Sequence, residues 1–476
     1  IRRGDRVGVY LDMSVAQVLA IFGASRAGAA FVPINSLLFP EQVAHIAKDC
    51  QMKALITSRD KLSVLAPVCK ELPALDFIVA SGRERNADCE LRNYSFEELL
   101  DTPAQADLSD SCIEKDLAAI LYTSGSTGKP KGVMLSHAQV MAGASIVSTY
   151  LNITSQDRIL TALPFSFDAG LNQLMTAFQQ GGTAVLMKFF FAREIVQRLA
   201  DEKVTGMGGV PTLWSLMAQS SSTLPKTPLP QLRYITNTGG RMPQTVLASL
   251  RELLPTTEIF LMYGLTEAFR STYLPPAELD RRPTSMGKAI PNTEILVIDE
   301  QGRELPRGEV GEIVGHSGSM MNGYHNQPAR SAEAEWKDTS GKRFIRTGDI
   351  GHFDEDGFLI LMDRRKDMII TGGFNVYPSD LEAVLRTHPE VADVAVVGVP
   401  SERWGETPVA FVVRNQGATV APEVLKEWTN KRLGKTQRLA TVEWAETLPR
   451  NAIGKVLKRE LREKWKANLS AQITKG

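Results

Sequence analysis

The chain has 476 residues, of which 43% are hydrophobic and 23% are charged, as in ordinary soluble globular proteins. This length is enough for two or three domains with a large core. Lys and Arg together number 54, and so do Asp and Glu. No overall charge therefore favours nucleic acid or a membrane surface as a partner.

Neither the cysteines nor the apolar stretches point to a secreted or membrane-spanning chain. The most apolar stretch, residues 13–34, contains Gln17, Ser25 and Arg26, so we predict an amphipathic core helix there and no transmembrane segment. No signal peptide is recognisable. The cysteines form no CxxC pair, and we predict reduced thiols in a cytoplasmic protein. They are Cys50, Cys69, Cys89 and Cys112.

The order of predicted elements indicates an α/β fold. Residues 1–120 alternate short apolar strands with helical patterns, and the same alternation returns at 158–265, which predicts parallel βαβ units. Residues 290–362 instead contain short strands separated by Gly, Asp and Pro turns, which favours a small antiparallel barrel or sheet. Because a strand pattern begins almost at Ile1, we expect an N-terminal segment to be missing.

A run of charged residues marks the predicted domain boundary. "DRRKD" at 363–367 follows a strand, and a second α/β pattern continues to the end of the chain. We predict a large domain over 1–363 and a smaller one over 364–476. From residue 424 onward there are 13 Lys and Arg but 5 Asp and Glu, so the end of the chain is locally basic.

The sequence "YTSGSTGKPKG" at 122–132 predicts an anion-binding loop. It follows an apolar strand at 117–123, and "SHAQ" at 136–139 provides a capping box for the next helix. Glycines let backbone N–H groups approach a phosphate, while hydroxyls and lysines add donors and charge. The loop is not a Walker A motif, because two residues separate Gly125 from Gly128 and Pro130 follows Lys129.

This loop resembles the signature of the AMP-forming adenylating superfamily, which includes acyl-CoA synthetases, peptide-synthetase adenylation domains and luciferases. The resemblance implies a large N-terminal domain of parallel βαβ subdomains with a small β-barrel region, and a small mobile C-terminal α+β domain. It also implies nucleotide contacts from the loop. These residues are Thr123, Ser124, Gly125, Ser126, Thr127, Gly128 and Lys131.

Further motifs of the superfamily follow in order. In "LPFSFDAGLNQL" (163–174), Phe167 is implied to wall the carboxylate site. Asp168 resembles the aspartate with which amino-acid-activating members pair the substrate's α-amino group. The same motif also occurs in simple acyl ligases, so both substrate classes stay open. "NTGGRMP" (237–243) resembles the adenine-side loop, with Gly239, Gly240 and Arg241 at the nucleotide.

"MYGLTE" (262–267) resembles the adenine and metal motif. By this resemblance Tyr263 stacks on adenine beside Gly264, Thr266 contacts phosphate, and Glu267 ligates the Mg²⁺ that bridges the phosphates. One carboxylate is sufficient, because Mg²⁺ in such sites takes substrate phosphates as its other ligands.

The remaining motifs lie near the second domain. "IRTGD" places Asp349 at the ribose hydroxyls, and Arg364 is implied to contact ribose and phosphate. Lys366 falls at the hinge position, while Arg365 is interpreted as solvated surface. In "TGGFN", Gly372 and Gly373 are implied to bind the pantetheine arm of CoA. "PRNAIGK" places Lys455 at the catalytic lysine position.

We therefore predict an acid–thiol ligase of fatty acid metabolism: an ATP-dependent, AMP-forming acyl-CoA ligase for a medium-chain, long-chain or aryl carboxylic acid. "FSFDAGLNQL" with "YGLTEAFRSTYLPP" also resembles bacterial acyl-CoA ligases of exosortase-linked gene clusters. The expected ligands are ATP, Mg²⁺ and coenzyme A, and no nucleic acid is expected.

Two alternatives stay open. The first is a free-standing adenylation enzyme that loads an amino or fatty acid onto the phosphopantetheine of a separate carrier protein. The second is a non-catalytic nucleotide- or acyl-binding protein, which is disfavoured because the main functional positions are all retained. These are Glu267, Asp349, Arg364 and Lys455.

Overall fold

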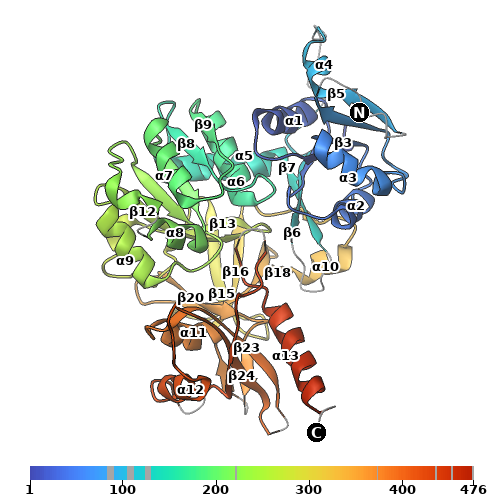
Figure 1. The fold of residues 1–476 in the computed structure, drawn as a ribbon. Coiled ribbons are helices and arrows are strands. Elements are labelled where there is room, and N and C mark those ends of the chain that lie inside the picture. Colours follow the sequence, from blue (N-terminus) through green and yellow to red (C-terminus); the bar gives the residue numbers. More distant parts are fainter. Residues whose placement is uncertain are drawn as a thin grey trace. The chain divides into compact units, whose positions relative to one another are not determined.

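We analysed a computed structural model of the chain. It describes residues 1–82, 91–103, 112–123, 130–219, 222–371, 374–401, 403–434, 437–451 and 454–473. Contacts divide the chain into two compact units (Figure 1). The first unit comprises Ile1–Ile295 and Val314–Thr347, and the second comprises Leu296–Ile313 and Gly348–Gly476.

An eight-stranded sheet forms one part of the first unit, in the order β17-β7-β6-β2-β1-β3-β4-β5. Its strands are β1 (Arg6–Tyr10), β2 (Ala30–Pro33), β3 (Ala54–Ser58), β4 (Phe77–Ser81), β5 (Arg92–Ser95), β6 (Leu117–Thr123), β7 (Lys131–Ser136) and β17 (Gly323–Tyr324). The six strands from β6 to β5 run parallel to their neighbours, whereas β7 and β17 add antiparallel pairs at one edge.

A seven-stranded sheet forms another part of the first unit, in the order β14-β13-β12-β11-β10-β8-β9. Its strands are β8 (Arg158–Thr161), β9 (Thr183–Leu186), β10 (Gly206–Gly209), β11 (Tyr234–Asn237), β12 (Glu258–Leu265), β13 (Phe269–Leu274) and β14 (Lys288–Ala289). The strands from β9 to β12 are parallel, and β13 and β14 are antiparallel.

Ten helices of the first unit lie between these strands in the described part of the chain. They are α1 (Val15–Arg26), α2 (Pro40–Asp49), α3 (Arg59–Cys69), α4 (Phe96–Leu100), α5 (His137–Tyr150), α6 (Asp168–Gln179), α7 (Ala192–Asp201), α8 (Pro211–Met217), α9 (Gln244–Leu253) and α10 (Pro328–Glu333). A buried apolar cluster joins Val9 of β1, Leu121 of β6 and Leu174 of α6. Burying such side chains stabilises the fold by roughly 1.5–3 kcal/mol each.

A third sheet has the order β15-β16-β19-β18, with β20 paired to β19. Its strands are β15 (Thr293–Ile298), β16 (Gly311–Ser317), β18 (Glu335–Lys337), β19 (Arg343–Phe353) and β20 (Leu359–Arg364). It occupies the region where the sequence predicts a small barrel or sheet, and its strand pairs β18–β19 and β19–β20 are antiparallel as expected.

The end of the second unit is built on a five-stranded sheet, β22-β21-β24-β23, in which β25 pairs with β24. Its elements are β21 (Ile369–Thr371), β22 (Phe374–Val376), α11 (Pro378–Arg386), β23 (Val391–Ser401), β24 (Gly405–Arg414), α12 (Pro422–Asn430), β25 (Thr441–Trp444) and α13 (Lys458–Ile473). Two buried clusters stabilise it, one around Val396 and Leu381 and one around Phe411 and Leu461.

The predicted α/β fold is confirmed, with parallel βαβ units followed by antiparallel strands and a smaller α+β region. The predicted boundary at residue 363 stays a prediction, and it falls inside the second unit. One detail differs. The phosphate-loop sequence joins two antiparallel strands, because β7 lies between it and the helix that Ser136 and Gln139 cap.

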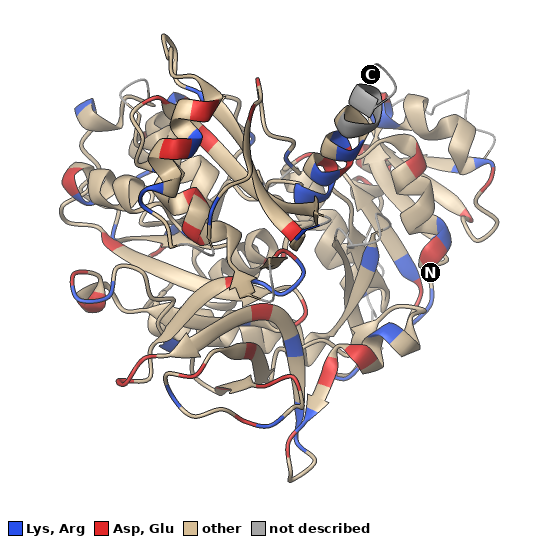
Figure 2. Ribbon diagram, turned by 90° about the horizontal axis from the view of Figure 1, so that it is seen from below, with Lys and Arg blue, Asp and Glu red and all other residues tan. Residues whose placement is uncertain are grey.

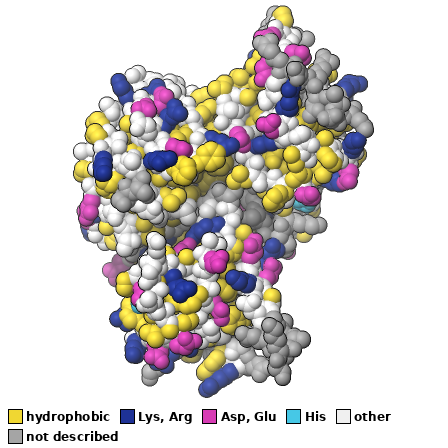
Figure 3. Space-filling view, in the orientation of Figure 1, with side chains coloured by type: hydrophobic (Ala, Val, Ile, Leu, Met, Phe, Trp, Pro, Cys, Tyr) yellow, Lys and Arg dark blue, Asp and Glu magenta, His cyan; other side chains and the backbone are white. Residues whose placement is uncertain are grey.

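Charge is distributed as the composition suggests. On the face drawn in Figure 3, charged side chains of both signs are interspersed among hydrophobic ones. Lys and Arg recur along α13, which carries much of the basic character at the end of the chain (Figure 2). Among the described residues, no helix combines the length and hydrophobicity that crossing a membrane requires.

Candidate active site

The phosphate-loop sequence is anchored at both ends by paired strands. Thr123 at the end of β6 lies opposite Lys131 at the start of β7. The Thr123 hydroxyl is buried and has no hydrogen-bond partner among the described residues, which is costly unless a ligand supplies one. The predicted contacts between these two anchors lie outside the described residues. They are Ser124, Gly125, Ser126, Thr127 and Gly128.

Lys131 and Glu267 form a buried ion pair with a tyrosine. The Lys131 Nζ lies 2.6 Å from Glu267 Oε1 and donates a 2.6 Å hydrogen bond to the Tyr324 hydroxyl. Tyr324 in turn donates to Glu267 Oε1 at 2.9 Å. The lysine at the end of the predicted phosphate loop is therefore held against the predicted magnesium ligand.

This pairing keeps Glu267 ionised. Burial alone raises the pKa of a carboxyl group, but the charge of Lys131 and the hydrogen bonds from Lys131 and Tyr324 bring the pKa of Glu267 below its ordinary value. Burial and the neighbouring Glu267 raise the pKa of Tyr324, which stays a neutral donor. The site thus holds an ionised carboxylate, which is the form that binds a metal cation.

A tight hairpin presents Thr266 and Glu267. Leu265 at the end of β12 pairs with Phe269 at the start of β13, so three residues form the turn. Gly264 is required just before it, because a Cβ there would lie 2.2 Å from the Phe269 carbonyl oxygen. Phe269 itself has φ +58°, which costs a non-glycine residue about 1 kcal/mol or more.

Packing against helix α5 holds Phe269 in this conformation. A Cβ on Gly143 would lie 2.7 Å from the Phe269 ring, so the absence of a side chain there makes room for the ring. Strain of this kind persists where surrounding structure over-determines it, and it clusters at functional sites.

Asp168 faces the same turn from helix α6. Its Oδ1 accepts a 3.3 Å hydrogen bond from the Thr266 hydroxyl, and its Oδ2 lies 3.8 Å from Arg270 Nη1. Burial raises the pKa of Asp168, although Arg270 and the Thr266 hydrogen bond oppose the shift. The structure thus brings Asp168 and Thr266 together.

The adenine-side loop lies beside the substrate motif. Gly239 has φ +77°, and a Cβ there would lie 3.7 Å from the Phe167 ring. Asn237 at the end of β11 donates a 2.9 Å hydrogen bond to the Gly240 carbonyl, which closes the loop. Arg241 is exposed. The predicted substrate wall and the predicted adenine loop are therefore neighbours.

Tyr263 is 6% exposed within β12, beside the bulge at Gly264. Its role in stacking on adenine stays a prediction.

In the second unit, the predicted ribose residues meet across two strands. Asp349 of β19 lies opposite Arg364 of β20, with 3.2 Å between Asp349 Oδ1 and Arg364 Nε. Arg365 instead lies 3.2 Å from the buried carboxylate of Glu312. It therefore forms an ion pair in the fold and is more than the solvated surface residue that the sequence predicted. Lys366 is exposed, and its role as the pivot stays a prediction.

Lys455 is presented by a short turn. Asn451 accepts a 2.8 Å hydrogen bond from the Lys455 N–H, and Gly454 adopts φ +77° to allow the turn. The residue as a whole is exposed. Removal of water from its ammonium group nevertheless lowers the pKa of Lys455 to about 7, and Arg364 acts in the same direction while Asp349 opposes it.

The two glycines implied to bind CoA, Gly372 and Gly373, lie outside the described residues. The described residues on either side, Thr371 of β21 and Phe374 of β22, pair with each other.

The residues that are present fit a magnesium nucleotide. Glu267 is ionised and Lys131 lies beside it. The buried Thr123 hydroxyl has no hydrogen-bond partner among the described residues. In the described part of the chain, no group of three or more His, Cys, Asp or Glu could hold a metal by itself. A Mg²⁺ ion at Glu267 would therefore depend on phosphate oxygens, which is its usual mode of binding beside nucleotides.

Comparisons with known proteins identify the family. A sequence family described as "AMP-binding enzyme" matches residues 1–325, and one described as "AMP-binding enzyme C-terminal domain" matches residues 380–455. The chain belongs to the AMP-binding enzyme family. This confirms, at the level of the family, the predicted resemblance to AMP-forming, ATP-dependent ligases.

Relatives within the family extend over nearly the whole chain. A long-chain-fatty-acid–CoA ligase of Mycobacterium tuberculosis is 33% identical over 471 residues, covering 98% of this chain and 90% of the relative. A fatty acid–[acyl-carrier-protein] ligase of Streptomyces coeruleorubidus is 33% identical over 472 residues, covering 97% and 87%. The ATP-bound crystal structure of MatB from Rhodopseudomonas palustris has a TM-score of 0.87 at 29% identity, covering 98% and 90%.

Two site residues were missed by reasoning from the sequence. Tyr324 reaches Glu267 through the pairing of β17 with β7, which are almost 190 residues apart and share no local motif. Arg270 could have been identified from the sequence. It lies within the strand "FRSTYL", and a buried arginine needs a specific polar or charged partner.

Proposed function

We propose that this AMP-binding enzyme is an acyl-CoA ligase that activates a carboxylic acid with ATP and transfers the acyl group to coenzyme A. The observation that carries the proposal is the buried cluster of Lys131, Glu267 and Tyr324. It places an ionised carboxylate and a cation at the end of the predicted phosphate loop. Thr266 and Asp168 adjoin it, where the acid would react.

In the first half-reaction, a carboxylate oxygen of the acid attacks the α-phosphorus of ATP. The bond from phosphorus to the bridging oxygen breaks, and pyrophosphate leaves with its electron pair. Because two anions must approach, the site has to neutralise negative charge, and fixed positive groups do this at no reorganisation cost. The ammonium form of Lys455 supplies that charge, Lys131 balances the charge of Glu267, and Asp349 and Arg364 orient the ribose.

When bound, Mg²⁺ would neutralise phosphate charge beside Glu267. Phe167 and Gly239 would border the acyl group and the nucleotide, because Gly239 of the adenine-side loop lies beside the Phe167 ring. Tyr263 would stack on adenine beside Gly264, and Arg241 and Gly240 would complete the adenine side. Nucleotidyl transfer needs little covalent chemistry from protein, so positioning of this kind contributes much of the rate.

In the second half-reaction, a thiol attacks the acyl carbon of the mixed anhydride and AMP leaves. Lys366 would act as the pivot that allows the C-terminal region to move, because hinges are a few residues at element ends. Gly372 and Gly373 would border the pantetheine arm. CoA and ATP are available in the cytoplasm, where we expect the enzyme to act.

A separate acyl carrier protein is the second candidate acceptor. Buried Asp168 supports it, because a buried carboxylate beside the reacting acid could pair with an α-ammonium group. The similarity to a fatty acid–[acyl-carrier-protein] ligase also supports it. In that case Asp168→Ala removes activity with amino acids selectively and leaves activity with simple acids.

The test is ATP–pyrophosphate exchange with fatty, aryl and amino acids, followed by thioester formation with CoA or a phosphopantetheinylated carrier protein. We expect acid-dependent exchange followed by acyl-CoA formation. Exchange without transfer to CoA, but with transfer to the carrier protein, would support the second candidate. No exchange with any acid, in a chain that includes any preceding segment, would overturn the proposed function.

A further inference from the structure

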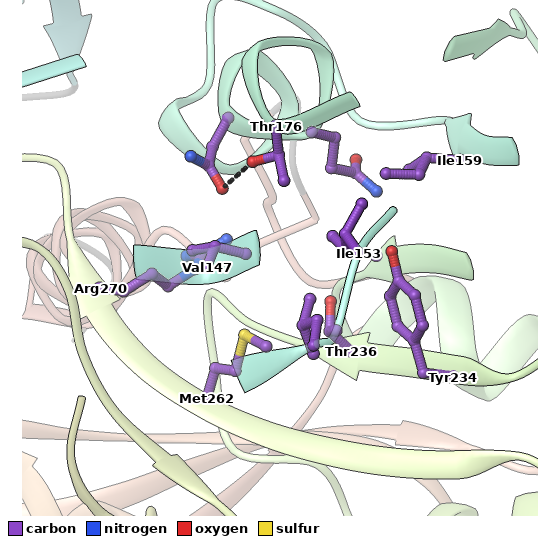
Figure 4. A pocket seen from close by; sticks show the side chains of 12 residues that line it. Val147, Ile153, Ile159, Thr176, Tyr234, Thr236, Met262 and Arg270 are labelled. Carbon is purple, nitrogen blue, oxygen red and sulfur yellow. Dashed lines mark hydrogen bonds between the residues drawn. The ribbon is translucent and has the colours of Figure 1, made fainter. Parts of the chain in front are cut away.

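A cavity in the first unit lies between helices α5 and α6 and strands β10 to β13. Its space is about 330 Å³ when the open solvent at its mouth and the gaps between its wall atoms are counted, so the part open to a ligand is much smaller. Figure 4 shows Arg270 reaching it from one side and Tyr234 lying on the other. Part of the wall is apolar. The polar side chains are those of Asn172, Gln173, Thr176, Thr236 and Arg270, with the hydroxyl-bearing Tyr234.

This cavity adjoins the proposed reaction centre. Met262 and Thr236 line it, and the next residues along β12 and β11 are Tyr263 and Asn237, which lead into the two proposed nucleotide segments. Arg270 connects the two regions directly, because its Nη1 donates a 2.8 Å hydrogen bond to the Thr238 hydroxyl. A group held in the cavity would therefore lie close to the activated carboxyl group.

Arg270 is a buried cation with unused hydrogen-bonding capacity. It is 5% exposed, and its Nε has no hydrogen-bond partner among the described residues. The 3.8 Å approach to Asp168 Oδ2 is longer than a hydrogen bond. A guanidinium has five donors in a planar fork that matches a carboxylate, so a buried one with a free edge is suited to receive an anion.

The opposite wall is also incompletely paired. The Gln173 Oε1 is buried without a partner among the described residues, whereas Asn172 accepts a 3.4 Å hydrogen bond from Thr176 (Figure 4). An alkyl chain would leave Arg270 and Gln173 unpaired away from water, which costs about 1–3 kcal/mol per group. A carboxylate oxygen would satisfy Arg270, whereas Gln173 Oε1 is itself an acceptor and needs a donor such as a water or an ammonium N–H.

We infer that the acid activated by this enzyme carries a second anionic group, a carboxylate in the simplest case, and that Arg270 binds this group. The inference rests on the proposed function and specifies its substrate class. The acid would be short, because Arg270 lies 3.8 Å from Asp168, which accepts the hydrogen bond from Thr266 at the proposed reaction centre. The distal carboxylate, held by the Arg270 fork, would orient the other carboxyl group toward the nucleotide.

Asp168 would distinguish two classes of acid that carry such a distal anion. A simple dicarboxylate needs only Arg270. An amino dicarboxylate would also place its ammonium group against Asp168, which faces Arg270 across 3.8 Å. Both share the distal anion, so both are included in the test.

The experiment compares acids matched in length in the pyrophosphate exchange reaction. Glutarate is compared with pentanoate, and glutamate with norvaline. The readout is the ratio of kcat/KM within each pair, which does not depend on the fraction of enzyme that is folded. We expect the anionic member of at least one pair to be preferred by at least ~100-fold, because a site built to bond a polar group rejects the analogue that lacks it.

Arg270→Met should reduce that preference to within about tenfold of unity, because it keeps the length of the side chain but removes its charge. If it fails to fold, the double variant Asp168→Asn with Arg270→Met leaves no unpaired buried charge and tests the same ratio. Arg282→Met is the matched control, since Arg282 is also a largely buried arginine in an ion pair, with Glu278 at 2.7 Å. It should leave the ratio unchanged.

Preference for pentanoate and norvaline, or a ratio that Arg270→Met does not alter, would overturn the inference and leave the proposed function standing. No exchange with any acid would instead overturn the proposed function, and the inference with it. Preference for glutarate over glutamate would identify a simple dicarboxylate, and the reverse an amino dicarboxylate. Either order supports the role of Arg270.

Discussion

Lys131 and Lys455 occupy the two units and differ in how their charge is balanced. Lys131 is largely buried and lies 2.6 Å from Glu267, so its charge is already compensated. Lys455 is exposed as a residue on a short turn, and its surroundings lower its pKa to about 7. The first lysine therefore contributes to the structure of the site. The charged form of Lys455 is disfavoured in the free enzyme, and an anionic ligand would stabilise it.

The largest expected effect is on catalysis by Lys455. Lys455→Ala should slow acyl-adenylate formation by roughly 10²–10³-fold, the usual cost of losing one electrostatic contact to the transition state. Pyrophosphate exchange measures this step. Thioester formation from synthetic acyl-adenylate should be nearly unchanged, because that step follows the departure of pyrophosphate.

The matched control is Lys464→Ala, which removes an exposed lysine from α13 and should leave both half-reactions intact. Equal losses in the two half-reactions of Lys455→Ala would show that the assigned role is wrong.

A smaller effect, on stability, should fall on the other lysine. Lys131→Met leaves Glu267 buried without its cation, and removal of one partner of a buried pair costs about 3 kcal/mol or more. Lys455→Met should not destabilise the protein, because it removes an ammonium group whose charged form is disfavoured in the folded state and leaves no buried partner unpaired. Urea unfolding of both variants measures the difference. Equal stability of the two variants would contradict the contrast between the lysines.

The dependence on pH should separate the lysines further. With a pKa of about 7 in the free enzyme, Lys455 is charged below that pH and loses its charge as the pH rises. The kcat/KM for ATP reports groups of the free enzyme, so it should fall by up to tenfold per pH unit above neutrality. Lys455→Arg stays charged throughout this range and should flatten the decline. An identical decline in that variant would assign it to another group.

The contrast between the lysines also indicates what sequence can predict. The strands, helices and order of motifs follow from periodicity and turn residues, so β6, α5 and the "GK" turn of Lys455 were predictable from local sequence. The partners were not. Tyr324 meets Glu267 only because β17 pairs with β7, and Phe269 keeps φ +58° only because Gly143 leaves space for its ring. Arg270 was visible in its strand, but its unpaired Nε and the cavity beside it depend on packing.

The smallest expected effect concerns adjacent arginines in the charged run. Arg364 faces Asp349, a proposed ribose residue, whereas Arg365 pairs with Glu312 and is half-exposed. Arg365→Ala should cost about 1 kcal/mol or more of unfolding free energy, because it removes a cation from the buried Glu312 carboxylate, and it should leave the KM for ATP unchanged. Arg364→Ala should raise that KM. Steady-state kinetics of the two variants measure the difference, and a raised KM in Arg365→Ala alone would show that the ribose contact has been assigned to the wrong arginine.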